Sequence, residues 1–272
     1  MFCLIKKINN KIKNKAKSFF RTAKNTSLNP SSVNEVSWIS DFFSACNDGF
    51  MIDVGAHFGE SFSAFANRGW KVFAFEPDPS IKKQDAIKRN LNSQSKSFTC
   101  ALSNTETDDA IFYNSDVSTG ISGIIPFHAS HSNCGTVQVR KLLRFINEFN
   151  IQEIDFLKID TEGNDLFVLK GLDWKVKPKV ILCEFEDEKT TKVGYNYQDL
   201  GNYLIDAGYH VLVSEWYPIK QYGIEHSWRG LHHYPYQLAT PLSWGNLIAI
   251  RPEYLKSFLN TLNHSGVSIS TN

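Results

Sequence analysis

The fold is decided by the stretch Phe50-Met51-Ile52-Asp53-Val54-Gly55-Ala56-His57-Phe58-Gly59. Three apolar residues lead into Asp53, and Gly55 and Gly59 bracket a turn before a segment with helical spacing at 60–68. A buried parallel strand that passes directly into a helix has this pattern. We therefore predict a strand, a tight turn and a helix here, and we expect the turn to hold a ligand against its backbone.

A second strand end carries the acid that such a ligand site needs. Residues 72–75 form another apolar run, and Glu76 follows it, 21 residues after Gly55 (76 − 55). That separation is typical of a carboxylate that binds a ribose. Together the two strand ends predict a nucleotide pocket.

His57 favours one cofactor over another. A dinucleotide fingerprint has glycine at this position, so that the backbone can approach a pyrophosphate. An imidazole would crowd a pyrophosphate, whereas S-adenosylmethionine contains adenine and ribose but no phosphate. The sequence therefore favours S-adenosylmethionine over NAD, and an oxidoreductase is the weaker alternative.

Acids also end two later apolar runs. Residues 154–159 lead into Asp160, the next turn contains Glu162, and residues 180–183 lead into Glu184. Ligands of open α/β sheets bind outside the carboxyl ends of the strands. We therefore expect these acids to converge with those of the first two strands on one crevice.

The composition predicts one large globular domain. The chain has 272 residues, of which 42% are hydrophobic, and this is ample for a buried core. Its five cysteines form no CxxC pair, and an odd count without a cleavable signal peptide suits a reducing compartment, so we expect a cytoplasmic protein. No apolar run approaches the length of a membrane-spanning helix.

Charge is concentrated at the amino terminus. Residues 1–24 contain 8 lysines and arginines and no acid, which leaves 21 basic against 28 acidic residues elsewhere (29 − 8 = 21). An acidic body is a poor nucleic-acid surface. The segment 1–24 itself predicts a basic amphipathic helix, which either contacts an anionic membrane or packs on the domain. We divide the chain into this helix with a linker and a short helix (1–45) and a main domain (46–272).

The tail predicts an antiparallel strand pair at one edge of the sheet, because the apolar runs 209–214 and 246–250 are joined without a long helix. The insertion between them, 215–243, contains six tryptophans and tyrosines and three histidines. Aromatic faces with polar edges suit a sugar-like acceptor, although the same side chains would also pack as a lid.

Several segments together resemble a known family. They are Asp53-Val-Gly-Ala-His-Phe-Gly59, Phe75-Glu-Pro-Asp78, Ala101-Leu-Ser103, Asp155-Phe-Leu-Lys-Ile-Asp-Thr-Glu-Gly163 and Leu169-Lys-Gly171. In this order they resemble the FkbM family of S-adenosylmethionine-dependent methyltransferases, over about residues 50–187. The resemblance implies a class I methyltransferase fold: a Rossmann-like three-layer α/β sandwich whose seven-stranded sheet is mostly parallel, with the antiparallel hairpin at its edge.

The resemblance also implies the residues of the site. The expected cofactor-binding residues are Asp53, Gly55, Ala56, His57, Gly59, Glu76, Pro77, Ala101, Leu102 and Asp160. Asp160 and Glu162 would lie beside the methyl group. The implied reaction is O-methylation of a hydroxyl on a sugar, glycan or related small molecule.

An alcohol attacks poorly while it keeps its proton, so we expect a general base. The candidates are Asp160, Glu162, Glu184, His226 and His233, with His232 less favoured. A divalent metal such as Mg²⁺, bound by Asp160, Glu184 and Asp187, is an option that the reaction does not require. The rival from another class is a non-catalytic ligand-binding or membrane-surface protein, since a fold alone does not establish chemistry.

Overall fold

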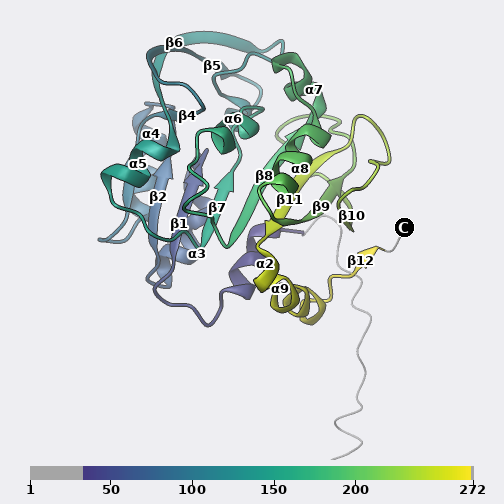
Figure 1. The fold of residues 1–272 in the computed structure, drawn as a ribbon. Helices are drawn as coiled ribbons and strands as arrows, with labels where there is room; N and C mark the ends of the chain where they lie inside the picture. Colours follow the sequence, from purple (N-terminus) through teal and green to yellow (C-terminus); the bar gives the residue numbers. More distant parts are fainter. Residues whose placement is uncertain (1–32, 271–272) are drawn as a thin grey trace, which may run out of the picture.

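The computed structural model describes residues 33–270. The predicted basic helix in residues 1–24 therefore lies outside the described residues. A large mixed sheet runs through the middle of the domain, with helices on both of its faces (Figure 1). In spatial order its nine strands are β12 (Ile269–Ser270), β10 (Trp228–His233), β9 (His210–Trp216), β11 (Trp244–Ile250), β8 (Val180–Glu186), β7 (Phe156–Ile159), β1 (Phe50–Val54), β2 (Lys71–Phe75) and β3 (Lys96–Phe98).

The first half of the large sheet, from β3 to β8 in spatial order, is parallel. Strands β3, β2, β1, β7 and β8 all run in one direction, so their carboxyl ends meet at one edge. Side chains of β1 and β2 alternate between the two faces: Ile52 and Phe73 pack into one apolar cluster, and Met51 and Val72 into the other. This alternation explains the continuous apolar runs in the sequence, because both faces are covered.

The helices form the two outer layers. One face is covered by α5 (Leu142–Glu148), α6 (Asp165–Lys170) and α8 (Tyr197–Asp206). The other is covered by α2 (Glu35–Phe42), α3 (Glu60–Asn67), α4 (Ile81–Asn90) and α9 (Pro252–His264). Two short helical segments, α7 (Asp187–Thr190) and the 3₁₀ turn η2 (Thr191–Val193), follow β8. The predicted three-layer α/β architecture is confirmed.

The predicted strand count is wrong. The sheet has nine strands rather than seven, because β10 lies inside the insertion 215–243 and β12 follows the last helix. Strands β9 and β11 do form the expected antiparallel pair. The pair is not the edge of the sheet, however, because β11 lies between β8 and β9, and β10 and β12 continue the sheet beyond β9.

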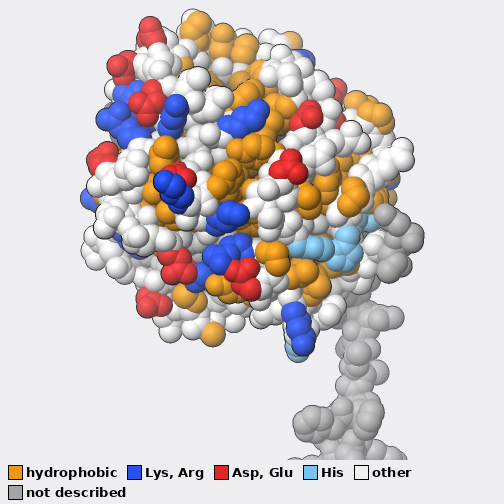
Figure 2. Space-filling model, viewed as in Figure 1, with side chains coloured by type: hydrophobic (Ala, Val, Ile, Leu, Met, Phe, Trp, Pro, Cys, Tyr) orange, Lys and Arg blue, Asp and Glu red, His pale blue; other side chains and the backbone are white. Residues whose placement is uncertain are grey.

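A second, three-stranded sheet stands over the parallel strands. It consists of β4 (Ala101–Leu102), β6 (His131–Arg140) and β5 (Thr107–Ser115), in that order, with a 3₁₀ turn η1 (Thr119–Ile121) between its two long strands. Much of β5 and β6 is exposed. In the common view of Figures 1 and 2, apolar side chains lie at the top of the molecule and continue down the middle of the face, over the region of β5 and α6. The sheet brings the turn η1 to the carboxyl edge of the large sheet.

Candidate active site

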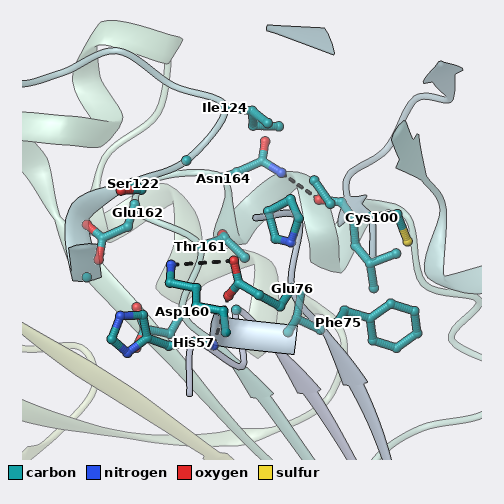
Figure 3. A pocket seen from close by; sticks show the side chains of 18 of the residues that line it. His57, Phe75, Glu76, Cys100, Ser122, Ile124, Asp160, Thr161, Glu162 and Asn164 are labelled. Atoms are coloured by element: carbon teal, nitrogen blue, oxygen red, sulfur yellow. Dashed lines mark hydrogen bonds and ion pairs between the residues drawn. The ribbon is translucent and has the colours of Figure 1, made fainter. Parts of the chain in front are cut away.

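A pocket opens at the carboxyl ends of β1, β2 and β7, under the turn η1. It encloses about 700 Å³ of empty space, including solvent at its mouth. Figure 3 shows its side chains converging from these strand ends and from the segment that contains Ser122 and Ile124. Ligands of open α/β sheets bind at this edge.

The turn after β1 forms the floor of the pocket. Gly55 has a φ of +81°, and a Cβ at this position would lie 1.8 Å from the backbone oxygen of Asp160. Only glycine allows the ends of β1 and β7 to approach so closely. His57 has a φ of +50°, and its backbone N–H donates to Glu76 Oε2 at 2.8 Å.

Glu76 is the buried acid of the pocket. Its side chain also accepts a hydrogen bond from the backbone N–H of Asp78 at 3.0 Å, and the ammonium of Lys83 lies 3.8 Å from Oε1. Burial raises the pKa of Glu76, while Lys83 and the two N–H donors oppose that shift. A carboxylate has about four acceptor positions, so Glu76 retains acceptor capacity for ligand hydroxyls.

His57 is neutral in this environment. Burial and the nearby charge of Lys83 lower its pKa to about 4. Its Nε2 lies 3.0 Å from the hydroxyl of Thr119, the first residue of η1. The imidazole thus links the glycine turn to the segment that covers the pocket.

Lys158 joins the acids of β1 and β7. Its ammonium lies 3.4 Å from Asp53 Oδ1 and 3.3 Å from Asp160 Oδ2, and it donates to the backbone oxygen of Gly55 at 3.3 Å. Burial opposes its charge, but Asp53 and Asp160 together raise the pKa of Lys158. Lys158 therefore stays charged and holds the glycine turn.

A second acid cluster borders the pocket. Glu162 lines the pocket, and its Oε2 lies 2.5 Å from the ammonium of Lys189 on α7. The same ammonium lies 3.1 Å from Glu184 and 2.6 Å from Glu186, both on β8. Burial raises the pKa of Glu162 to about 7 even though Lys189 opposes the shift. Glu162 can thus gain or lose a proton near neutral pH.

Most of the residues that we named from the sequence line this pocket. They are Gly55, His57, Glu76, Pro77, Ala101, Leu102, Asp160 and Glu162. Within residues 33–270, Asp53, Ala56, Gly59 and Glu184 are not part of the lining. Asp53 is completely buried beneath the turn, where it also accepts a hydrogen bond from Ser61. It supports the turn and Lys158 rather than contacting the pocket.

His233, one of the predicted bases, does not lie at the pocket. Strand β10 runs antiparallel to β9, so His233 lies near the amino end of β9, at the edge of the sheet opposite the pocket. Its Nδ1 lies 3.0 Å from Nε2 of His210. Histidine side chains accordingly gather low on the right of the face in Figure 2, near β9 and β10.

The other two histidines of the insertion do not line the pocket either. His226 lies in a separate surface groove with Tyr217 and Ile224, and its ring packs against Trp244. His232 is buried against Tyr236. Of the base candidates, the described part of the chain thus brings Asp160 and Glu162 to the pocket.

The proposed metal ligands are not brought together as a set. Oxygen atoms of Asp160, Glu162 and Glu184 lie within 4.8 Å of one another, so Glu162 takes the place that we gave to Asp187. Asp187 instead accepts a hydrogen bond from the backbone N–H of Tyr197 at 2.6 Å. Glu162 and Glu184 already share the ammonium of Lys189, which supplies the positive charge that a metal ion would bring. This donor set does not fit a divalent metal, and we assign no role to one.

The pocket does fit S-adenosylmethionine. Gly55 lines the pocket without a side chain, and Glu76 offers a buried carboxylate to ribose hydroxyls. Apolar side chains of Phe75, Cys100 and Leu102 line the same pocket and suit an adenine. His57 stands where a pyrophosphate would need open backbone.

Sequence patterns did not reveal the roles of three lysines, Lys83, Lys158 and Lys189. Lys158 lies within a quoted motif, yet an alternating strand pattern does not tell whether a long side chain turns toward a buried acid. Lys189 stands three residues after Glu186, a spacing that places both on one side of a helical turn. This spacing of three residues is the sequence signal from which the ion pair of Glu186 and Lys189 could have been predicted.

The comparisons with known proteins agree on a methyltransferase. The family model described as the FkbM methyltransferase domain matches residues 53–211. A curated relative, the methyltransferase sdnD of Sordaria araneosa, is 28% identical over 176 residues, which cover 50% of this chain and 66% of that protein, just under two thirds of its length. In the described part of the chain, no helix is long and apolar enough to cross a membrane.

Solved structures of methyltransferases are similar at lower identity. The precorrin-6y C5,15-methyltransferase of Geobacter metallireducens is 14% identical, with a TM-score of 0.41, covering 83% of this chain and 94% of its own. The magnesium protoporphyrin IX methyltransferase of Synechocystis, solved with bound SAH, is 12% identical, with a TM-score of 0.42 and 80% coverage of both chains.

Proposed function

The chain belongs to the FkbM methyltransferase family, and from that premise we propose that it transfers a methyl group from S-adenosylmethionine to a hydroxyl of a sugar, glycan or related small molecule. The observation that carries this proposal is that Glu76 and Glu162 line one pocket, one at its ribose-binding end and the other beside Asp160. A carboxylate that binds the cofactor and a carboxylate that can accept a proton are thus held in a single site.

Bound S-adenosylmethionine would supply an activated methyl group on a positively charged sulfonium. The residues of this chain contribute orientation and charge. Gly55 gives the ligand access to the backbone, Glu76 binds ribose hydroxyls, and Asp160, at the pocket edge, favours the positive charge of the donor. Alignment in a pocket that excludes water supplies most of the catalysis expected for such a transfer.

We assign the proton of the acceptor hydroxyl to Glu162. Its pKa of about 7 is close to neutral pH, where a general base is most effective. Asp160 lies in the same pocket, where its Oδ2 lies 3.3 Å from the ammonium of Lys158, but it shows no comparable feature of a base. Glu162 is therefore the better acceptor of a proton.

A carbohydrate acceptor is supported by the insertion. Its surface groove contains Tyr217, which is 48% exposed, together with Lys220, Glu225 and His226. An exposed aromatic ring beside polar groups suits the C–H faces and hydroxyls of a sugar. The segment that contains Gly223 packs against the backbone of Val117, so the insertion adjoins the cover of the pocket.

Calorimetric titration with S-adenosylmethionine tests the cofactor part of the proposal. The native protein should bind, and Glu76→Ala should weaken binding by about 10-fold or more, because the ribose loses charge-assisted hydrogen bonds. Glu148→Ala, which removes an exposed acid on α5, should bind as the native protein does. Absence of binding by the native protein would contradict the proposal.

A screen for acceptors tests the reaction. Free sugars, glycans and lipid-linked sugars would be incubated with cofactor and protein and analysed for a mass gain of one methyl group. Transfer should disappear in Glu162→Gln. Tight cofactor binding without methylation of any hydroxyl compound would favour the alternative, a non-catalytic binding protein on the same fold.

A further inference from the structure

Lys189 is buried at the centre of the second acid cluster. Its side chain comes from the short helix α7 and is 1% exposed, and its ammonium contacts Glu162, Glu184 and Glu186. The rings of Phe127 and Tyr222 lie over the ammonium at 5.1 Å and 5.9 Å. Carboxylates and aromatic rings together therefore shield the ammonium from water.

The backbone of the turn that contains Glu162 and Gly163 allows Lys189 to pack closely against it. Glu162 has a φ of +59°, which is uncommon for a residue with a side chain. Gly163 follows with a φ of +99°, and a Cβ there would lie 3.2 Å from Cβ of Lys189. The left-handed pair thus presents the Glu162 carboxylate to the pocket while the lysine packs against the turn.

The charges in this cluster do not cancel. Three carboxylates surround one ammonium in a buried environment, where an uncompensated charge is costly. One of the carboxyl groups must therefore hold a proton near neutral pH, and groups so close share it as a coupled set. Burial raises the pKa of Glu184 well above its usual value, which agrees with a proton stored on the side of the cluster away from the pocket.

Other charged and titratable groups face the cluster. Each of them either shifts the pKa of a cluster residue or has its own pKa shifted by one. They are Asp160 after β7, Asp165 on α6, His131 on β6, and Tyr222 and His226 in the insertion. Tyr222 donates its hydroxyl hydrogen to Glu186 Oε1 at 2.8 Å. None of these neighbours adds a fixed positive charge, so Lys189 is the cation that compensates the cluster within residues 33–270.

We propose that Lys189 is the positioning residue of the base: its ammonium holds Glu162 by Oε2, which leaves Oε1 for the acceptor, and its charge favours the ionised form of this carboxylate. The proposal rests on the proposed function of Glu162. In the step concerned, the proton of the acceptor hydroxyl moves to Oε1 and the O–H bonding electrons remain on the acceptor oxygen. Lys189 itself neither gains nor loses a proton.

The titration of Glu162 tests this without an acceptor. The full chain, labelled with ¹³C at the glutamate carboxyl carbons, would be followed by NMR against pH, and Glu162→Gln would assign the signal. Lys189→Met should raise the midpoint for Glu162 by about 1 pH unit or more, because the compensating charge is lost. Lys256→Met, which removes an exposed lysine on α9, should leave the midpoint unchanged.

A second substitution keeps the test decisive even if Lys189→Met does not fold. Glu186→Gln keeps Lys189 and nearly the same shape but removes one negative charge, so it should lower the midpoint for Glu162. A purely structural role of Lys189 does not predict shifts of opposite sign in these two variants. Equal midpoints in the native protein, Lys189→Met and Glu186→Gln would overturn the proposal.

Cofactor binding separates this proposal from the proposed function. Lys189→Met and Glu186→Gln should bind S-adenosylmethionine within about 3-fold of the native protein, because neither side chain lines the pocket in the described part of the chain. If the native protein fails to bind, the proposed function fails whatever the titration shows. If it binds but the midpoints do not move, only the role of Lys189 fails.

Discussion

The backbone oxygen of Asp160 packs directly against Gly55, so that a Cβ at Gly55 would lie 1.8 Å from it. The residues are 105 positions apart in the chain (160 − 55), yet this contact joins the ends of β1 and β7 beneath the pocket. The contact also sets the distance between the turn after β1 and the turn after β7. The turn of Gly55 and the turn that contains Glu162 are therefore in direct contact, and a substitution that moves one turn should also move the other.

Gly55→Ala should destabilise the protein and abolish cofactor binding. A residue with a side chain costs about 1–2 kcal/mol at a left-handed φ, and the clash with Asp160 adds to it, so we expect a loss of about 3 kcal/mol or more in the free energy of unfolding. Gly194→Ala is the matched control, since its φ is +89° but nothing lies within 4 Å of the new Cβ. Equal losses in the two variants, measured by urea unfolding, would refute the argument.

Methyl transfer should depend on pH through Glu162. A base acts in its deprotonated form, so kcat should rise with pH through a midpoint near 7, the pKa of this group. Glu162→Gln should lower kcat by about 10²–10⁴-fold, since the general base is lost, while cofactor affinity changes little. The rate would be measured with an acceptor found in the screen. A flat profile between pH 6 and 8 in the native protein would count against Glu162.

The central strands and the pocket were predictable because local patterns specify them. Strands buried on both faces leave continuous apolar runs, and the residues after them, Asp53, Glu76 and Asp160, stand out as acids at the ends of these runs. Since carboxyl ends of parallel strands share an edge, their convergence followed from topology. What the patterns do not tell is whether an acid reaches the pocket or, like Asp53, supports it from below.

One outer strand of the large sheet was not predictable for a related reason. Strand β10 lies inside the predicted insertion and contains Gly230 and two histidines in place of an apolar run. Without β10 the direction of the chain at His233 is unknown, so the sequence does not show that this histidine lies away from the pocket. The roles of the buried lysines were not predictable, because a side chain this long can reach a distant acid from an exposed or a buried position.

Glu35 should be important for stability although it does not line the pocket. Its Oε1 accepts hydrogen bonds from Ser214 at 2.6 Å, Trp216 at 2.8 Å and Asn246 at 3.3 Å, which ties α2 to β9 and β11. Glu35→Ala leaves these donors without a buried acceptor and should cost about 2–4 kcal/mol in urea unfolding. Glu60→Ala removes another first-turn acid, but an exposed one, and should cost less than about 1 kcal/mol. Similar losses would contradict the assignment.

Asp165→Asn should make the protein more stable above neutral pH. Burial raises the pKa of Asp165 from its ordinary value to about 6, and its Oδ1 has no hydrogen-bond partner within residues 33–270. As pH rises from about 4 to 6, the unfolded chain ionises first, so native stability falls over this window and stays lower above it. Asparagine removes the penalty. The variant should therefore gain about 1–3 kcal/mol at pH 7.5 and almost nothing at pH 4, whereas Asp85→Asn, at an exposed position on α4, should show no such window. Urea unfolding at the two pH values measures the difference, and a gain of equal size at pH 4 would show that burial of the charge is not its cause.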